Sequence, residues 1–141
     1  MKGNNMSFDL NKQNFSKAAS EGYTFNLVLP DGKESDATLT VIGDMSKVVK
    51  AHSRKRYQEL QLRSKTAARK GKDDELSIEE AEEYVIADSL VRLVGWTGFT
   101  EDGKEVPFNK DKAEEILREH SWIRDLILKE AAEVTNFSPK V

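Results

Sequence analysis

The side chains that could act as catalytic bases or nucleophiles are few. The chain has no cysteine and two histidines, His52 and His120. A nucleophilic triad needs a positioned base beside a serine, threonine or cysteine, and neither histidine sits in a recognisable motif. The absence of cysteine also excludes disulfides and thiolate zinc sites. We therefore expect no nucleophilic catalysis, and we interpret both histidines as surface or helix-boundary residues.

Acidic residues occur in adjacent pairs, Glu79-Glu80 and Glu114-Glu115, and in one run of three at residues 73–75. Adjacent residues of a helix point in different directions, so such pairs do not converge as a catalytic acid and base. The run of three lacks the loop spacing of a calcium site, and the glycines do not form a phosphate-cradling turn. We expect no metal, no cofactor and no enzymatic activity.

Length and composition predict a single domain with a modest core. The chain has 141 residues, of which 38% are hydrophobic and 33% charged, whereas an ordinary globular domain has roughly 45–50% and 25%. No stretch approaches the ~20 apolar residues of a membrane span. The first ten residues also lack the apolar segment of a signal peptide. We expect a soluble intracellular protein that does not bind membranes.

Charge is segregated along the chain. The net charge is −3, but residues 47–72 carry ten basic residues against one acid, and residues 73–88 carry eight acids and no base. Apolar residues recur within both blocks, so we interpret them as two helices of opposite charge. The basic and acidic helices then either pair as an antiparallel hairpin or leave the basic face in solvent.

The amino-terminal part predicts strands. Residues 1–22 read as an arm or a short helix, and residues 23–43 as a β-hairpin. Tyr23–Leu29 alternates apolar with polar residues, Pro30–Lys33 has turn chemistry, and Ala37–Ile42 is rich in β-branched residues.

Helix signals dominate residues 44–135, which we assign to the same domain. Asp44 and Asn109 are candidate N-caps, and Ser77 with Glu80 matches a capping box. We expect the helix from Ile78 to about Val94 to be the most buried, followed by a loop or small hairpin around residues 102–103. A break near residue 120 precedes the last helix, and residues 136–141 form a flexible tail. The predicted fold is α+β and mainly α-helical, with an N-terminal β-hairpin followed by about four helices.

The sequence leaves two alternative binding functions, nucleic-acid binding and protein binding. The basic helix 47–72 could lie against nucleic-acid phosphates through residues such as Arg54, Arg56 and Arg63. The acidic overall balance and the lack of an aromatic stacking series weigh against nucleic acid. The alternative is a protein partner, because tryptophans anchor many interfaces. Our candidate contact residues are Trp122, Ile123, Ile127 and Phe137, with core packing as the competing interpretation of each.

The order of motifs resembles that of the tail assembly chaperones of long-tailed bacteriophages and prophages. The likeness begins with Phe8-Asp9-Leu10, continues through a small strand pair and the Gly-x-x-Ser of residues 43–46, and includes a long charged helix and an acidic linker. Its most specific part is a Gly-Trp-x-Gly segment followed by Asp-Gly-Lys-x-x-Pro-Phe and a capped helix. That part comprises Gly95, Trp96, Gly98, Asp102, Gly103, Pro107 and Phe108.

The resemblance implies a non-enzymatic protein of the host bacterial cytoplasm. Such chaperones bind the tape-measure protein and keep it soluble while the tail tube assembles, and they are not retained in the virion. The resemblance also implies that the tail tube protein is a partner through a longer, frameshifted form. We further expect weak self-association into a homo-oligomer, because copies that stack along one repetitive partner gain avidity.

Overall fold

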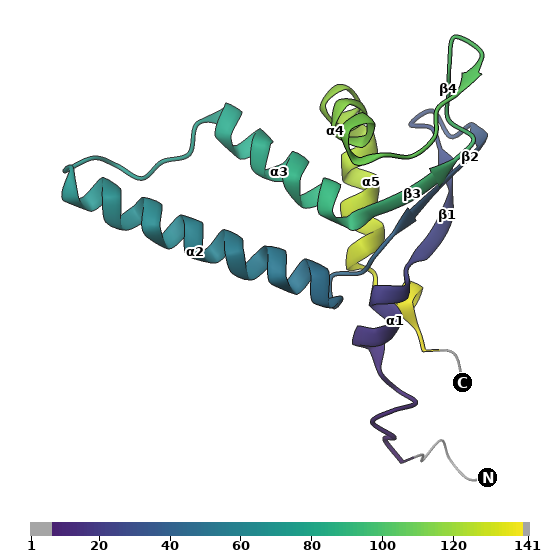
Figure 1. The fold of residues 1–141 in the computed structure, drawn as a ribbon, viewed down its shortest axis with the longest axis horizontal. Helices are drawn as coiled ribbons and strands as arrows, with labels where there is room; N and C mark the ends of the chain where they lie inside the picture. The colour runs from purple at the N-terminus through teal and green to yellow at the C-terminus, as the bar shows by residue number, and fades with distance from the viewer. Residues whose placement is uncertain (1–6, 140–141) are drawn as a thin grey trace.

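A helical arm and a small sheet give the chain its shape (Figure 1). The computed structural model describes residues 7–139. The helices are α1 (Phe15–Glu21), α2 (Lys47–Arg69), α3 (Ile78–Arg92), α4 (Lys110–Glu119), α5 (Ser121–Ala132) and the 3-10 helix η1 (Val134–Phe137). The strands are β1 (Tyr23–Val28), β2 (Glu34–Val41), β3 (Leu93–Thr97), β4 (Thr100–Glu101) and β5 (Lys104–Glu105). The fold is α+β and mainly helical, as predicted.

The three-stranded sheet is antiparallel and has the order β1-β2-β3. The predicted hairpin is confirmed, with Tyr23 opposite Val41 and Phe25 opposite Leu39. The hydroxyl groups of Thr24 and Thr40 share a 2.7 Å hydrogen bond across the two strands. Alternate residues of β2, by contrast, are buried. One face of the sheet therefore packs on the core and the other carries threonines, as expected of an antiparallel sheet with one solvated side.

Strand β3 differs from the prediction, which continued the preceding helix to about Val94. The helix ends at Arg92, and the next five residues form a strand along β2, in which Trp96 lies opposite Leu39. Leu93 and Trp96 are 0% and 7% exposed. Burial of these side chains against β2 and the helices explains the change, because tertiary packing overrides a helical sequence pattern.

Two of the three helix N-caps that the sequence predicts are confirmed. Ser77 and Glu80 form the complete capping box of α3, and the Asn109 side chain caps α4. The cap of α2 is the buried Ser46, whose side chain accepts a hydrogen bond from the Val49 amide. Asp44 instead accepts a 2.8 Å hydrogen bond from Arg92 at the end of α3.

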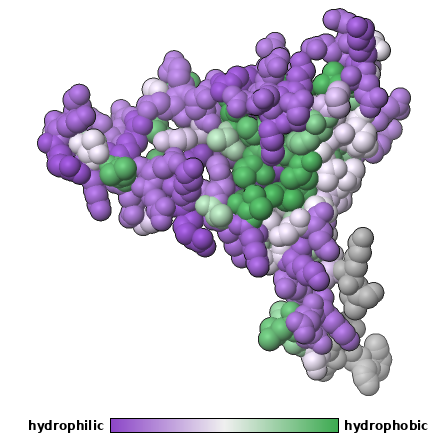
Figure 2. All heavy atoms as spheres, viewed as in Figure 1, coloured by the Kyte–Doolittle hydropathy of each residue, from purple (hydrophilic) through white to green (hydrophobic). Residues whose placement is uncertain are grey.

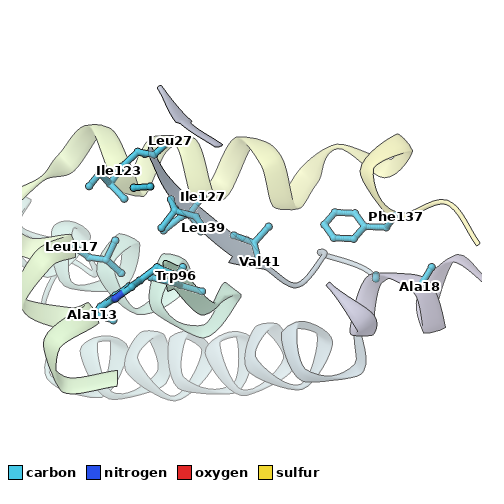
Figure 3. Close-up of a cluster of buried hydrophobic side chains, with 13 residues drawn as sticks. Ala18, Leu27, Leu39, Val41, Trp96, Ala113, Leu117, Ile123, Ile127 and Phe137 are labelled. Atoms are coloured by element: carbon cyan, nitrogen blue, oxygen red, sulfur yellow. The ribbon is translucent and has the colours of Figure 1, made fainter. Parts of the chain in front are cut away.

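The core lies between the buried face of the sheet and helix α5 (Figure 3). Leu39 and Val41 of β2 meet Ile127 of α5, and Leu117 of α4 extends the cluster. Helix α5 buries more side chains than α3, contrary to our expectation that α3 would be the most buried helix. The reason is the position of α3. Its first half pairs with α2 in the projecting helical arm, and only its second half reaches the core.

The end of the chain is packed where we predicted a flexible tail from residue 136. Phe137 is 2% exposed and its ring makes an edge contact with Tyr23. Gly43 makes room for that ring, since a Cβ at residue 43 would lie 3.0 Å from the Phe137 ring and 2.9 Å from the Ala19 Cβ. The tail prediction is therefore wrong for Phe137, and residues 140–141 lie outside the described part of the chain.

Candidate partner-binding site

The four predicted contact residues divide into one surface residue and three core residues. Trp122, in the first turn of α5, is partly buried. Ile123, Ile127 and Phe137 are 4%, 0% and 2% exposed. A side chain with so little exposed surface cannot contact a partner in the folded protein. The prediction is therefore corrected for these three residues, and Trp122 alone remains a candidate for direct contact.

Trp122 borders an apolar groove between α5 and the turn that joins β1 to β2. The groove has a volume of about 370 Å³. One side is formed by Val28 at the end of β1 with Leu29 and Pro30 of the turn, and the helix side is formed by Trp122 and Leu126. The sequence did not indicate Val28, Leu29 or Pro30 as site residues, because no local pattern shows which helix packs beside the β1–β2 turn. The groove thus joins two segments that are distant in sequence.

The buried isoleucines set the position of this groove. On a helix with 3.6 residues per turn, Ile123 and Ile127 share one stripe, and Trp122 with Leu126 shares the neighbouring stripe. Figure 3 shows Ile123 beside Leu27, and Ile127 beside Leu39 of the sheet. Because the isoleucine stripe faces the sheet, the second stripe lies at the edge of the interface. Ile123 and Ile127 therefore position the groove without forming its surface.

One acid and one base, Asp125 and Lys129, lie at the rim of the groove and complete its lining. Both side chains are exposed. Within residues 7–139 neither makes an ion pair. An apolar pocket flanked by one available charge of each sign can hold an apolar side chain and orient the segment that carries it.

The segment with the most specific family likeness forms an aromatic cluster that joins the core through Trp96. Trp96 stacks on Phe99 and makes an edge contact with Phe108, both at 4.8 Å between ring centroids. Its indole Nε1 donates a 2.7 Å hydrogen bond to the Val106 carbonyl. Pro107 is exposed. The aromatic residues of the segment therefore brace the β4–β5 hairpin and do not line the groove.

The glycines of that segment differ in backbone conformation and in the space that a Cβ atom would have. Gly98 has φ +75°, and a Cβ there would lie 2.9 Å from Ala37 Cα. Asp102 and Gly103 form the β4–β5 turn with φ values of +53° and +81°. Gly95 has ordinary space around it, with the nearest atom of another segment at 3.7 Å.

The arm formed by α2 and α3 is held together by ion pairs, as one of our two interpretations of the charge blocks expected. Asp88 accepts hydrogen bonds from His52 at 2.8 Å and from Arg56, whose guanidinium also lies 4.1 Å from the centre of the Tyr84 ring. Arg63 donates to Asp74 at 2.9 Å and to Glu80. The arm is therefore an oppositely charged helical hairpin.

Glu80 is the acid most affected by this pairing. Its pKa is lowered from 4.5 to about 2, first because Arg63 donates to it and then because the Ser77 amide does. The same contact raises the pKa of Arg63. Hydrogen bonds to a carboxylate favour its charged form. The charged state of Glu80 is thus tied to the pairing of α2 with α3.

Two further cations fasten the arm to the core. Lys110 donates to the carbonyls of Leu90 and Leu93 at 2.6 and 2.7 Å, and burial lowers its pKa. This ammonium satisfies carbonyls at the end of α3, where a helix dipole favours positive charge. Arg124 of α5 is 8% exposed, lies 3.5 Å from the carboxylate of Glu82 on α3, and donates at 2.8 Å to the carbonyl of Leu117 at the end of α4.

The residues considered for catalysis do not converge. His52 is paired with Asp88, whereas the exposed His120 stands at the junction of α4 and α5. Glu114 pairs with Arg118. In the described part of the chain, no group of three or more potential ligands could hold a metal ion. No described helix has the length and apolarity needed to cross a membrane.

A larger hollow, of about 470 Å³, lies at the tip of the arm. Its lining mixes Leu62 and Ala67 with charged residues of both signs, including Arg63, Lys70 and Asp74. Arg63 and Asp74 are bound to each other there. This hollow lies at the tip of the arm and contains none of the predicted contact residues, whereas the groove contains Trp122, so we place the candidate site at the groove.

The structure is that of a small α+β protein with an apolar groove beside helix α5. A family model described as "YdaY prophage protein" matches residues 45–141, which is more than half of the chain. The chain therefore belongs to this prophage protein family. The matched segment includes the arm, β3 and α5, with Trp122. Neither the curated proteins nor the solved structures gave a match.

Proposed function

We propose that this prophage protein is a tail assembly chaperone that binds the tape-measure protein. In this role it keeps the tape-measure protein soluble while the tail tube assembles, and it is absent from the finished virion. Membership of a prophage family and the chaperone-like order of motifs, including Gly95–Gly98 and Asp102–Phe108, support the proposal. We also propose that it acts in the host cytoplasm by binding and release, without catalysis.

The groove beside Trp122 is the observation that carries this proposal. It is apolar on both walls, and one acid and one base stand at its rim. An amphipathic helix recognises such a surface through one or two apolar anchors, while charged residues at the edge set its direction. A tape-measure segment that exposes apolar side chains before assembly is a partner of this kind, and covering them keeps it soluble.

Co-expression with the tape-measure protein of the same prophage tests the proposal. The wild-type chain should keep that protein in the soluble fraction and be recovered with it. Trp122→Ala should lower recovery at least tenfold per folded chaperone, because about 1.4 kcal/mol of lost binding energy is a tenfold change in affinity. Tyr57→Ala is the matched control, since Tyr57 is an aromatic residue with 61% exposure on the distant arm.

Stability must be separated from binding, because Trp122 also packs against the core. Its removal should cost about 1–2 kcal/mol of folding free energy, less than for a fully buried aromatic residue. Lys129→Glu, which changes only an exposed rim charge, serves as a second variant that should fold normally and bind less well. If both variants are recovered with the tape-measure protein as well as wild type per folded molecule, the groove is not the binding site.

The remaining partner predictions belong to the same proposal. A longer form made by frameshifting would recruit the tail tube protein, and copies of the chain would associate along one tape-measure molecule. Binding several copies to one long partner raises the overall affinity through effective concentration.

A further inference from the structure

Helix α2 has a face that the ion pairs of the arm do not use. Val49, His52, Arg56 and Arg63 belong to the inner face of α2, which packs on α3. At 3.6 residues per turn, the opposite side of the helix carries five basic residues. We call them the basic stripe: Lys47, Lys50, Arg54, Lys65 and Arg69. All five side chains are exposed.

The basic stripe is not neutralised by the rest of the protein. In the described part of the chain, none of its five cations makes an ion pair. The residues interspersed on the same side are Ala51, Gln58, Gln61 and Ala68, so no acid interrupts it. Glu59, the one acid of α2, is directed toward the side of Arg63, with which it lines the hollow at the tip.

The acids that balance the net charge lie on the other side of the arm. Asp74, Glu80 and Asp88 face the inner side of α2, where they bind its arginines. Glu83 and Glu82 pair with arginines of α4 and α5. The overall charge of −3 is therefore a poor guide to this surface. A polyanion that approached the arm from outside would meet the basic stripe first.

The composition of the stripe indicates which anion it suits. A helix docking along α2 would need a continuous apolar seam, whereas the stripe holds only lysine, arginine, glutamine and alanine. Lysine, arginine and glutamine side chains all donate to phosphate oxygens. Single-stranded nucleic acid is bound through stacking aromatics, and Tyr57 is the one aromatic residue on α2. These features favour a duplex over an acidic helix or a single strand.

We propose that the basic stripe binds the phosphate backbone of duplex DNA without reading its sequence. The stripe runs from residue 47 to residue 69, which at about 1.5 Å per residue spans about 33 Å. One turn of B-form DNA is about 34 Å long. Arg56 and Arg63, which we had counted among the phosphate contacts, are excluded because α3 holds them.

Fluorescence anisotropy of the full chain with a labelled 30-base-pair duplex tests this proposal. Neutralising five phosphates predicts a slope of about −4.5 for log affinity against log salt concentration. Affinity should then fall roughly 500-fold between 50 and 200 mM salt. A chain that fails to bind the duplex at 50 mM salt would overturn the proposal.

Charge variants assign the binding to the stripe. The triple variant Arg54→Gln, Lys65→Gln and Arg69→Gln should reduce the slope to about −1.8, because two of the five contacts remain. The control removes the same number of exposed cations elsewhere: Lys12→Gln, Lys33→Gln and Lys104→Gln. It should keep the wild-type slope. Circular dichroism of both triples checks that each is folded, and Arg54→Lys with Arg69→Lys should bind like wild type.

Two results would contradict the assignment to DNA. The first is an equal loss of slope in the control triple, which would mean that net charge alone governs binding. The second is binding of a poly-glutamate peptide as tightly as the duplex, with the same dependence on the stripe. That result would identify an acidic protein as the occupant of the stripe.

Discussion

Neighbouring apolar residues of α5 have different roles, because one side of the helix faces the sheet and the adjacent side faces the groove. Ile123 and Trp122 are neighbours of similar apolar character, yet the first is 4% exposed and the second lines the groove. Helix α5 is apolar on several sides, so the sequence did not indicate which stripe faces the sheet. Trp122 was therefore predictable as a candidate, whereas the burial of Ile123 and Ile127 required the sheet.

The two glycines of the segment 95–98 give a test at this scale. Gly98→Ala should lower the free energy of unfolding by about 3 kcal/mol, because it combines a strained positive φ with a contact against the Ala37 backbone. The melting temperature should fall by roughly 10 °C. Gly95→Ala is the control, since its Cβ would meet only ordinary contacts. Equal melting temperatures of the two variants would refute this reading of Gly98.

At the scale of elements, sequence signals predicted the structure correctly where it depends on residues that are close together in the chain. The capping box at Ser77, the cap at Asn109 and the β1–β2 hairpin depend on adjacent residues, and all three are confirmed. Strand β3 and the packing of Phe137 depend on distant segments. Neither has a local pattern strong enough to reveal it, which explains why a helix end and a flexible tail were predicted instead.

The pairing of α2 with α3 predicts how stability depends on pH. The pKa of Glu80 is lowered in the folded protein, so its contribution is present above about pH 4.5 and is lost as pH falls toward about 2. The melting temperature of wild type should therefore exceed that of Glu80→Gln above pH 4.5, and the two should converge near pH 2. Glu79→Gln is the control in the same turn of α3, and because it leaves the contact between Glu80 and Arg63 in place, it should keep the pH dependence that Glu80→Gln removes.

At the scale of the whole molecule, charge segregation leaves two separate surfaces. The arm projects to one side of the fold, and the β1–β2 turn with its groove lies on another (Figure 1). Figure 2 shows hydrophilic residues over most of the arm and apolar residues gathered where α3 meets β3. The low hydrophobic share thus reflects a small core with a long solvated arm, which the charge blocks of the sequence indicated. The position of the groove followed only from the packing of α5 on the sheet.

The central claim is that the groove beside Trp122 holds the tape-measure protein. Site-specific photo-crosslinking tests it most directly, with the crosslinking residue placed at Lys129 on the groove rim and, as a control, at the exposed Lys104 of β5. When the chain is co-expressed with the tape-measure protein, position 129 should crosslink to that protein and position 104 should not. Crosslinking at 104 alone, or at neither position while the two proteins still co-purify, would contradict the claim.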